Sequence, residues 1–260
     1  MTQEIVFLGL PFFRLPFDQA VEALVSPILN RTLQRLYFCN AHTVVTCWKN
    51  PALVKALLQA DHILADGSGV LWSSWLLGKP LRHNLNGTDL IPALCQRACG
   101  EGLSVYFLGA KPGVAQAAAQ GIAASCPFPL HIAGIQDGYF LETEIEGVLQ
   151  HIRDTNPHLL LVALGVPHQE LWIDRYSPVL PGIACVGVGG LFDFMAQRVV
   201  RAPLWLRSIG MEWIWRLAME PRRLGRRYTL GNLEFLYLVL RYGFTRRGLR
   251  VLGSPPSDRA

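Results

Sequence analysis

No apolar run in the 260-residue chain reaches the ~18 residues that a membrane-spanning helix needs. The most apolar windows, 158–166 and 230–240, are too short, and the second contains Glu234. The first residues, MTQEIVFLGLPFF, lack the basic start of a signal peptide and include Glu4. We therefore expect a cytoplasmic protein.

Motifs for metals, disulfides and common nucleotide sites are also missing. The six cysteines form no C-x-x-C pair, and the seven histidines form no H-E-x-x-H motif and no Cys/His cluster. We expect reduced, buried thiols and no metal site. Neither G-x-G-x-x-G nor G-x-x-x-x-G-K-[ST] occurs, so the chain has no dinucleotide fingerprint and no P-loop.

Charged residues are scarce, at 17%, and they are unevenly distributed. Residues 198–250 hold twelve Arg and three Glu, a net charge of +9, which leaves −4 for the rest of the chain. A basic tail on a mildly acidic body indicates an anionic partner. The alternative is a solvated basic face, which ranks lower because the arginines alternate with Trp, Leu and Phe.

Short apolar runs alternate with helical patterns along residues 1–197. This alternation predicts a Rossmann-like α/β fold, in which helices cover both faces of a mostly parallel sheet. The expected strands are 5–8, 36–39, 63–65, 105–108, 130–133, 159–164 and 184–188, and the expected helices are 18–29, 52–60, 68–77, 89–99, 113–124, 142–153 and 169–176. Residues 198–260 are interpreted as a separate, helical and basic appendage that associates with a membrane.

The residues after the predicted strands are polar or glycine, and this is where a parallel sheet binds its ligand. The candidates are Asn40, Asp66, Gly109, Asp137, Tyr139, Gly165, Gln169, Gly190 and Asp193. L-G-A-K-P-G-V (108–114) leads from a strand through a glycine turn into a helix, whose free N–H groups favour a phosphate. Together with V-G-V-G-G (186–190), it favours a nucleotide diphosphate.

Several candidates also have a purely structural interpretation. Asp66 is either a general base or a cap or turn residue before the next helix, and the residues alone favour the cap. Asp137 and Asp193 share this ambiguity. Tyr139 is either a core aromatic or a ring that stacks on a base, and Gln169 is a candidate donor to a phosphate or sugar.

The tail combines aromatic and aliphatic residues with its arginines. Trp205, Ile209, Trp213 and Leu217 are spaced by four and predict an apolar stripe. Pro221 predicts that the helix ends or kinks just before it. The Leu-rich segments beside the arginines favour a membrane surface over a nucleic acid.

A series of short motifs occurs in one order along residues 5–228. They are N-A-H (40–42), A-D-G-S-G (65–69), N-G-T-D-L (86–90), F-L-G-A-K-P-G-V (107–114), D-G-Y-F (137–140), A-L-G-V-P-H-Q-E-L-W-I (163–173), G-V-G-G-L-F-D (187–193), R-A-P-L-W (201–205), E-W-I-W-R-L (212–217) and E-P-R-R-L-G-R-R (220–227). In this order and at these spacings the chain resembles the WecG/TagA/CpsF glycosyltransferase family, glycosyltransferase family 26. The joint match is highly specific.

The resemblance implies an inverting transfer of a sugar from a UDP donor, without a metal or other cofactor. The acceptor is a polyprenyl-diphosphate-linked sugar at the inner face of the cytoplasmic membrane, used in cell-surface polysaccharide synthesis. By position, Asp66 matches the family's proposed general base, and Asn40 and Gln169 match its substrate-contacting residues. The resemblance leaves the oligomeric state open, with a homo-oligomer as one possibility.

The resemblance also gives the basic tail a role. Arg216, Arg223 and Arg226 match basic residues of a C-terminal appendage that is thought to complete the active site at the membrane. The expected partners of the tail are therefore diphosphates and an anionic membrane surface, with no nucleic acid.

Two positions depart from the family pattern. Many members have Thr where this chain has Phe38, and Arg where it has Asn84. Both lie near the expected sugar site, so the donor sugar is either of the N-acetylmannosamine type or a neutral hexose such as glucose. Two other function classes stay open: an NAD(P)-dependent Rossmann oxidoreductase, which lacks its glycine fingerprint, and a non-enzymatic nucleic-acid-binding module that uses the Arg/Trp tail.

Overall fold

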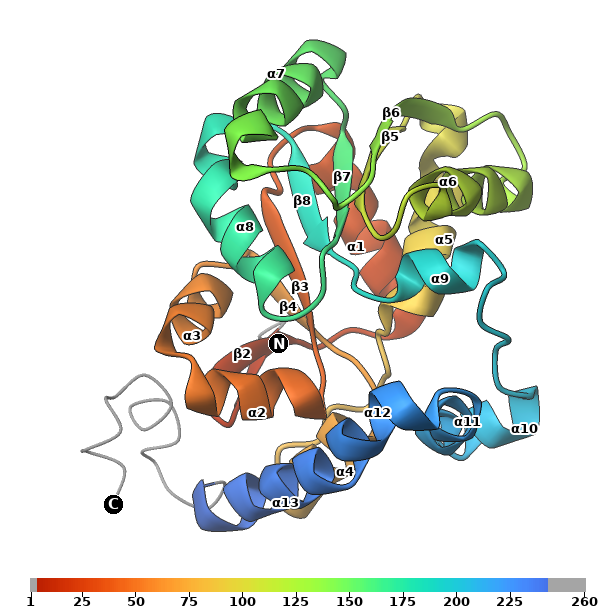
Figure 1. Cartoon of the computed structure of the whole chain (residues 1–260). Helices are drawn as coiled ribbons and strands as arrows, with labels where there is room; N and C mark the ends of the chain where they lie inside the picture. The colour runs from red at the N-terminus through yellow and green to blue at the C-terminus, as the bar shows by residue number, and fades with distance from the viewer. Residues whose placement is uncertain (1–3, 243–260) are drawn as a thin grey trace.

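The apolar runs form one sheet in the computed structural model, which describes residues 4–242 (Figure 1). Its strand order is β1-β2-β4-β3-β8-β7-β5-β6, and every neighbouring pair except β1 and β2 is parallel. The predicted Rossmann-like, mostly parallel α/β fold is therefore confirmed. The strands are β1 (Glu4–Phe7), β2 (Leu10–Phe13), β3 (Arg35–Cys39), β4 (His62–Ala65), β5 (Ser104–Gly109), β6 (His131–Gln136), β7 (Leu159–Ala163) and β8 (Ala184–Gly187).

The predicted strand 5–8 is confirmed as β1, and it forms a hairpin with β2, which the sequence analysis did not predict. The two-residue turn of this hairpin consists of Leu8 and Gly9, whose φ angles of 45° and 81° are the left-handed pair that a type I′ turn requires. Strand β2 was missed because Leu8 replaces the Asn or Asp that usually marks this turn. Strand β2 joins the hairpin to β4.

Helices cover both faces of the sheet, as Figure 1 shows. One layer contains α1 (Phe17–Leu29), α5 (Gly87–Ala98), α6 (Val114–Ser125) and α9 (Leu191–Met195), and the other contains α2 (Ala41–Lys49), α3 (Pro51–Leu58), α7 (Ile145–Thr155) and α8 (His168–Tyr176). Alternate side chains of a strand pack against opposite helix layers. In β3, Leu36 and Phe38 belong to one hydrophobic core, and Tyr37 and Cys39 belong to the other. The six cysteines are free thiols, and all but Cys126 are buried.

The C-terminal helices form a row along the lower end of the molecule in Figure 1. They are α10 (Leu204–Ser208), α11 (Glu212–Met219), α12 (Pro221–Tyr228) and α13 (Leu230–Tyr242), and α4 (Ser68–Leu76) of the core lies beside them. Helix α13 packs on α2, with Phe235 and Val239 buried in the core and an ion pair of 2.5 Å between Lys49 and Glu234. The expected helical C-terminal region is thus present up to Tyr242 and rests on the core, and residues 243–260 of the predicted appendage lie outside the described residues.

The predicted apolar stripe of the tail does not lie on one helix. Gly210, with a φ of 74°, separates α10 from α11, so Trp205 and Trp213 belong to different helices. Trp205 is 66% exposed, whereas Trp213 packs edge-on against Tyr228. The predicted break at Pro221 is confirmed, because this residue is the first of α12. In residues 4–242, no helix is both long and apolar enough to cross a membrane.

Candidate active site

The sheet has a switch point between its neighbouring strands β3 and β8. The chain leaves β3 into α2 in one helix layer and leaves β8 into α9 in the other. The two loops therefore diverge, which is where open α/β sheets bind ligands. Asn40 follows β3 at this point, and Gly189 and Gly190 follow β8.

Asn40 connects the switch point to the neighbouring strand β4. Its Oδ1 caps α2 by accepting from the Thr43 backbone N–H at 3.1 Å, and its Nδ2 donates to Oδ2 of Asp66 at 3.1 Å. The N-cap of α4 is Gly67, and no side chain caps that helix. The helix-cap interpretation of Asp66 is therefore wrong. Its carboxylate lies at the carboxyl edge of the sheet, next to the switch point.

Gln169, in the first turn of α8, connects the loops after β7 and β8. Its Oε1 accepts from the backbone N–H of Gly165 at 3.2 Å and from that of Gly189 at 2.9 Å, and its Nε2 donates to Oε1 of Glu170 at 2.9 Å. A Cβ at Gly187 would lie 2.9 Å from Nε2 of Gln169. The absence of a side chain at Gly187, in the motif V-G-V-G-G, is thus explained by its packing against Gln169 and does not by itself indicate a ligand.

The loops after β5 and β6 meet farther along the same edge. Gly109 is required by the sheet itself, because a Cβ there would lie 2.5 Å from the carbonyl oxygen of Ala163. Asp137 accepts from the backbone N–H of Tyr139 at 2.9 Å, so the turn interpretation of Asp137 is correct. Tyr139 is 69% exposed, which excludes the core interpretation. A shallow cavity of about 340 Å³, also lined by His151, lies beside these two residues.

The appendage spans the switch point from one side to the other. At its near end, the hydroxyl of Ser68, the first residue of α4, donates to the carbonyl oxygen of Gly210 at 2.7 Å, just beyond β4. At its far end, the guanidinium carbon of Arg216 lies 4.8 Å from the centre of the Phe194 ring, and a Cβ added at Gly190, in the loop after β8, would lie 3.4 Å from Nη2 of Arg216. Since β4, β3 and β8 are consecutive neighbours in the sheet, residues 210–216 lie across the edge that contains Asn40 and Asp66.

The other predicted arginines are placed differently. Arg226 is exposed, and the side chain of Arg223 lies outside the described residues. Burial, together with the nearby charges of Arg227 and Lys49, lowers the pKa of His42, the last residue of the N-A-H motif, to about 4. Arg227 therefore faces the N-A-H motif. Asp193 lies half-buried in the first turn of α9.

A model of the Glycosyl transferase WecG/TagA/CpsF family matches residues 5–249. The chain belongs to this family. As a family member it is a glycosyltransferase.

Three relatives carry the same name, N-acetylglucosaminyldiphosphoundecaprenol N-acetyl-beta-D-mannosaminyltransferase. The relative from Bacillus spizizenii is 36% identical over 67% of this chain and 67% of its own length. The relative from Bacillus subtilis is 31% identical over 79% of this chain and 75% of its own length. The relative from Staphylococcus aureus strain MW2 is 29% identical over 86% of this chain and 88% of its own length.

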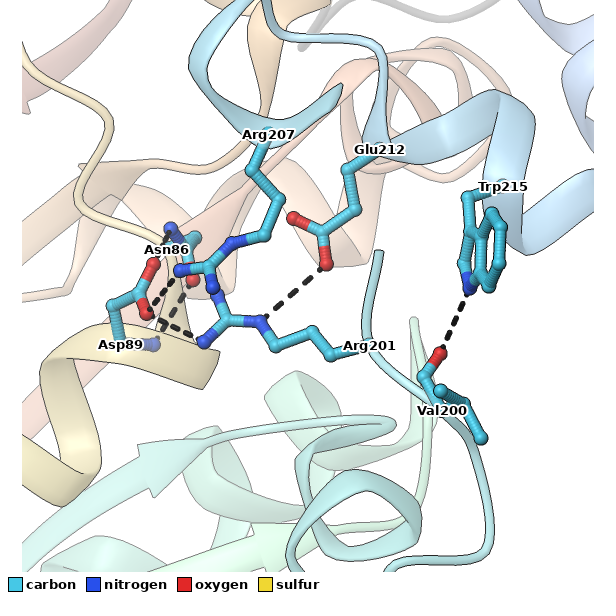
Figure 2. A network of polar contacts seen from close by, with 7 residues as sticks. All are labelled: Asn86, Asp89, Val200, Arg201, Arg207, Glu212 and Trp215. Carbon is cyan, nitrogen blue, oxygen red and sulfur yellow. Dashed lines mark hydrogen bonds and ion pairs between the residues drawn. The ribbon is translucent and has the colours of Figure 1, made fainter. Parts of the chain in front are cut away.

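Ion pairs with Asp89, in the motif N-G-T-D-L (86–90), connect the appendage to the core (Figure 2). Arg201 and Arg207 converge on Oδ1 of Asp89, at 2.6 and 3.2 Å, and Arg201 also lies 3.6 Å from Glu212. We call Asp89, Arg201, Arg207 and Glu212 the latch. Because Glu212 precedes Arg216 by four residues on α11, the latch also fixes the residue that reaches Gly190.

Charge complementarity stabilises the latch. Burial alone would raise the pKa of Asp89, but the hydrogen bonds from Arg201 and Asn86 and the charges of Arg201 and Arg207 outweigh burial and hold this pKa below its usual value. Asn86 caps α5 and donates to Oδ2 of Asp89 at 2.9 Å, which leaves Oδ1 to the arginines. The carboxylate is therefore ionised wherever the protein is folded near neutral pH.

Sequence reasoning missed the latch and Glu170. The side chain of Glu170 is completely buried beneath the switch point. An acid inside the apolar pattern of V-P-H-Q-E-L-W-I was the available signal. Among the described residues, no three His, Cys, Asp or Glu side chains gather in a way that would hold a metal ion.

Proposed function

We propose that the protein is an inverting, UDP-sugar-dependent hexosyltransferase that acts on a polyprenyl-diphosphate-linked sugar in cell-surface polysaccharide synthesis. The observation that carries this proposal is the Asp66 carboxylate, held by Asn40 beside the switch point and beneath residues 210–216. The relatives' names support the acceptor class, because each names an N-acetylglucosaminyldiphosphoundecaprenol.

Asp66 is the general base of the proposed reaction. Asn40 occupies Oδ2, and among the side chains that the structure describes no donor reaches Oδ1, so this oxygen accepts the proton of the acceptor hydroxyl. As the proton leaves, the acceptor oxygen bonds to the anomeric carbon, and the bond from that carbon to the diphosphate oxygen breaks. Attack on the side opposite the leaving group inverts the anomeric centre.

Negative charge develops on the leaving UDP and has to be offset. Arg216 and the N-terminus of α6 are the groups that we assign to this task in place of a metal ion. Nε of Arg216 is buried and has no hydrogen-bond partner among the described residues, so it is available to an anion. Gln169 acts indirectly, because its amide is already engaged with the two glycine loops.

The nucleotide extends along the sheet edge towards β6. Strands β8 and β6 are three positions apart in the sheet, about 14 Å at the usual strand spacing, a length that a nucleoside diphosphate sugar can span. The exposed ring of Tyr139 then stacks on uracil beside the cavity at Asp137.

The donor sugar is either of the N-acetylmannosamine type or a neutral hexose such as glucose. Asn84 accepts from the backbone N–H of Gly67 at 2.9 Å and thereby braces the loop that carries Asp66. Phe38 is buried, and its ring packs on Gly87. Asn84 is therefore the departure from the family pattern that acts next to the base.

We also propose that the protein is peripheral on the inner face of the cytoplasmic membrane. Large apolar side chains are exposed on α4, α10 and α13, namely Trp72, Trp75, Leu76, Leu204, Trp205, Leu233, Leu236 and Leu240. Helix α4 lies next to its neighbours at two points, because a Cβ added at Gly210 would lie 3.2 Å from the Trp72 side chain and a Cβ added at Gly69 would lie 3.8 Å from that of Phe235. These helices therefore form one region. Exposed tryptophans and leucines beside arginines suit an anionic lipid surface.

A screen of UDP-sugars with a short-chain lipid-diphosphate sugar tests the enzymatic proposal. Transfer to the lipid acceptor, with UDP raising the melting temperature and NAD leaving it unchanged, is the expected result. Stabilisation by NAD alone would instead favour the oxidoreductase.

Sedimentation with anionic vesicles tests the location. The Trp72→Ser/Trp75→Ser variant is expected to lose binding, whereas Phe128→Ser, a change of another exposed aromatic residue, retains it. Binding to oligonucleotides without binding to vesicles would support the nucleic-acid module.

A further inference from the structure

The side-chain amide of Gln169 sits between two kinds of neighbour. On one side, the N–H groups of Gly165 and Gly189 both point at its oxygen. On the other side, its nitrogen faces the carboxyl group of Glu170 at 2.9 Å. If the amide were rotated by half a turn, three donors would crowd together and the carboxyl oxygen would face a carbonyl oxygen. The amide therefore has one favourable orientation.

We propose that Glu170 is a positioning residue that fixes the Gln169 amide and thereby sets the separation of the loops after β7 and β8. The proposal deepens the function proposed above and rests on it only for the claim that these loops receive the diphosphate. Glu170 touches no reacting group; it acts through Gln169.

Retaining an acid at this position is costly, which argues for a specific task. Glu170 is 0% exposed, and its Oε2 has no hydrogen-bond partner among the described residues. A buried acceptor without a partner destabilises a fold, and a buried charge does so more strongly. Burial raises the pKa of Glu170 to about 7, although the Gln169 hydrogen bond lowers it. An apolar residue would fill the same space without this cost.

Among the described residues, no neighbouring group offers Glu170 a compensating charge. Tyr37 and Cys39 from β3 and Cys47 from α2 interact electrostatically with it, and burial raises the pKa of all three, so they are neutral near pH 7. Of the described side chains, that of Gln169 is the one that donates a hydrogen bond to this carboxyl group, whose other hydrogen bond is with the backbone of Glu170 itself. This leaves the orientation of the amide as the task that the carboxyl group performs.

Site-resolved amide hydrogen exchange in the full-length protein without ligand tests the inference. Glu170→Leu removes the acceptor, Glu170→Gln keeps an acceptor oxygen of the same reach, and Trp172→Phe alters a buried residue of the same helix. Gly165 and Gly189 are expected to exchange about tenfold faster in the Leu variant and at nearly the wild-type rate in the other two. Unchanged exchange in the Leu variant would overturn the proposal, as would equally fast exchange in all three.

Kinetics then separate positioning from a loss of overall stability. For a UDP-sugar, the Leu variant is expected to raise KM and to lower kcat, and the Gln variant is expected to restore most of both. In the double variant Gln169→Ala/Glu170→Leu, the losses should be no larger than in Gln169→Ala alone, because both changes break one interaction. Additive losses would contradict the inference. A wild-type protein that neither binds nor uses UDP-sugars would remove the proposed function and leave the exchange result intact.

Discussion

The two sides of the switch point are held by different kinds of interaction. On the core side, Gln169 is 3% exposed, and its hydrogen bonds to the glycine loops and to Glu170 are sealed from water. On the appendage side, Asp89 and its two arginines are ion-paired but keep 25–32% of their side-chain surface exposed. Salt screens such exposed pairs and hardly affects buried hydrogen bonds.

We therefore infer that the loops after β7 and β8 form the rigid side of the site, and that residues 201–216 of the appendage form a side that can detach. The loops after β7 and β8 are built into the core, and the Gln169 amide that joins them is shielded from water. The segment that brings Arg216 to Gly190 depends on charges that solvent can reach. We therefore expect changes on the core side to alter the chemistry or the fold, and changes in the latch to alter how often the site is covered.

The largest expected effect lies on the core side, at Asp66. Asp66→Asn removes the group that accepts the proton and should lower kcat by about 10²–10⁴, with little change in the melting temperature. Asp18→Asn, a change of an exposed carboxylate in the first turn of α1, is the matched control. Near-wild-type turnover of the Asp66 variant with UDP-sugar and lipid acceptor would remove the base assignment.

The next largest effect is expected on the appendage side, at Arg216. Arg216→Ala should lower kcat by about 10²-fold, because a cation that stabilises the leaving diphosphate is lost. Arg216→Lys keeps the charge but loses the stacking of the guanidinium on Phe194. The kcat of this variant should therefore lie between those of the wild type and Arg216→Ala. Arg222→Ala, a change of an exposed arginine on α12, should leave kcat unchanged. Equal losses in the Arg216 and Arg222 variants would point to net charge alone.

The buried acid on the core side predicts a pH dependence of stability. The pKa of Glu170 is about 7 in the folded protein, above its ordinary 4.5, so its contribution to stability is complete below pH 4.5 and is lost as the pH rises to 7. Relative to the wild type, Glu170→Gln should therefore gain stability over this interval, on the order of 3 kcal/mol by pH 8. Denaturant unfolding at pH 5 and pH 8 measures the free energy of unfolding of the variant relative to the wild type. If this free-energy difference were the same at both pH values, the assigned pKa would be contradicted.

The smallest expected effect is on the latch, and it should depend on salt. Asp89→Asn removes the charge that two arginines share and should loosen the appendage by about 1 kcal/mol at low salt. Proteolysis between the core and α11 should become several-fold faster in this variant. High salt should bring the wild type towards the variant, and a difference that salt does not change would show that the latch is not electrostatic.

Sequence patterns were sufficient for every strand of the sheet except β2, and for the neighbourhood of Asn40 and Asp66. Both residues follow predicted parallel strands, and the carboxyl ends of such strands meet at one edge, so their proximity followed from the pattern. The break at Pro221 was equally local, since proline begins a helix but does not continue one. These features depend on neighbours in sequence or on a single periodicity.

The features that escaped prediction depend on contacts between distant segments. The bond from Gln169 to Gly189 joins residues 20 apart, and the latch joins residues 112 and 118 apart. No local pattern distinguishes Arg227, which faces His42, from Arg226, which is exposed. The turn at Gly210 was missed for a different reason, because a spacing of four across residues 205–217 imitates one continuous helix.

The central claim is that core and appendage form one UDP-sugar site across the switch point. Hydrogen exchange of the full-length protein with and without UDP tests it most directly. We predict that UDP slows exchange both in the loops at 164–169 and 187–191 and in α11, with the protection of α11 reduced by Arg216→Ala. Protection of the core loops with α11 unchanged would contradict the claim that the appendage completes the site.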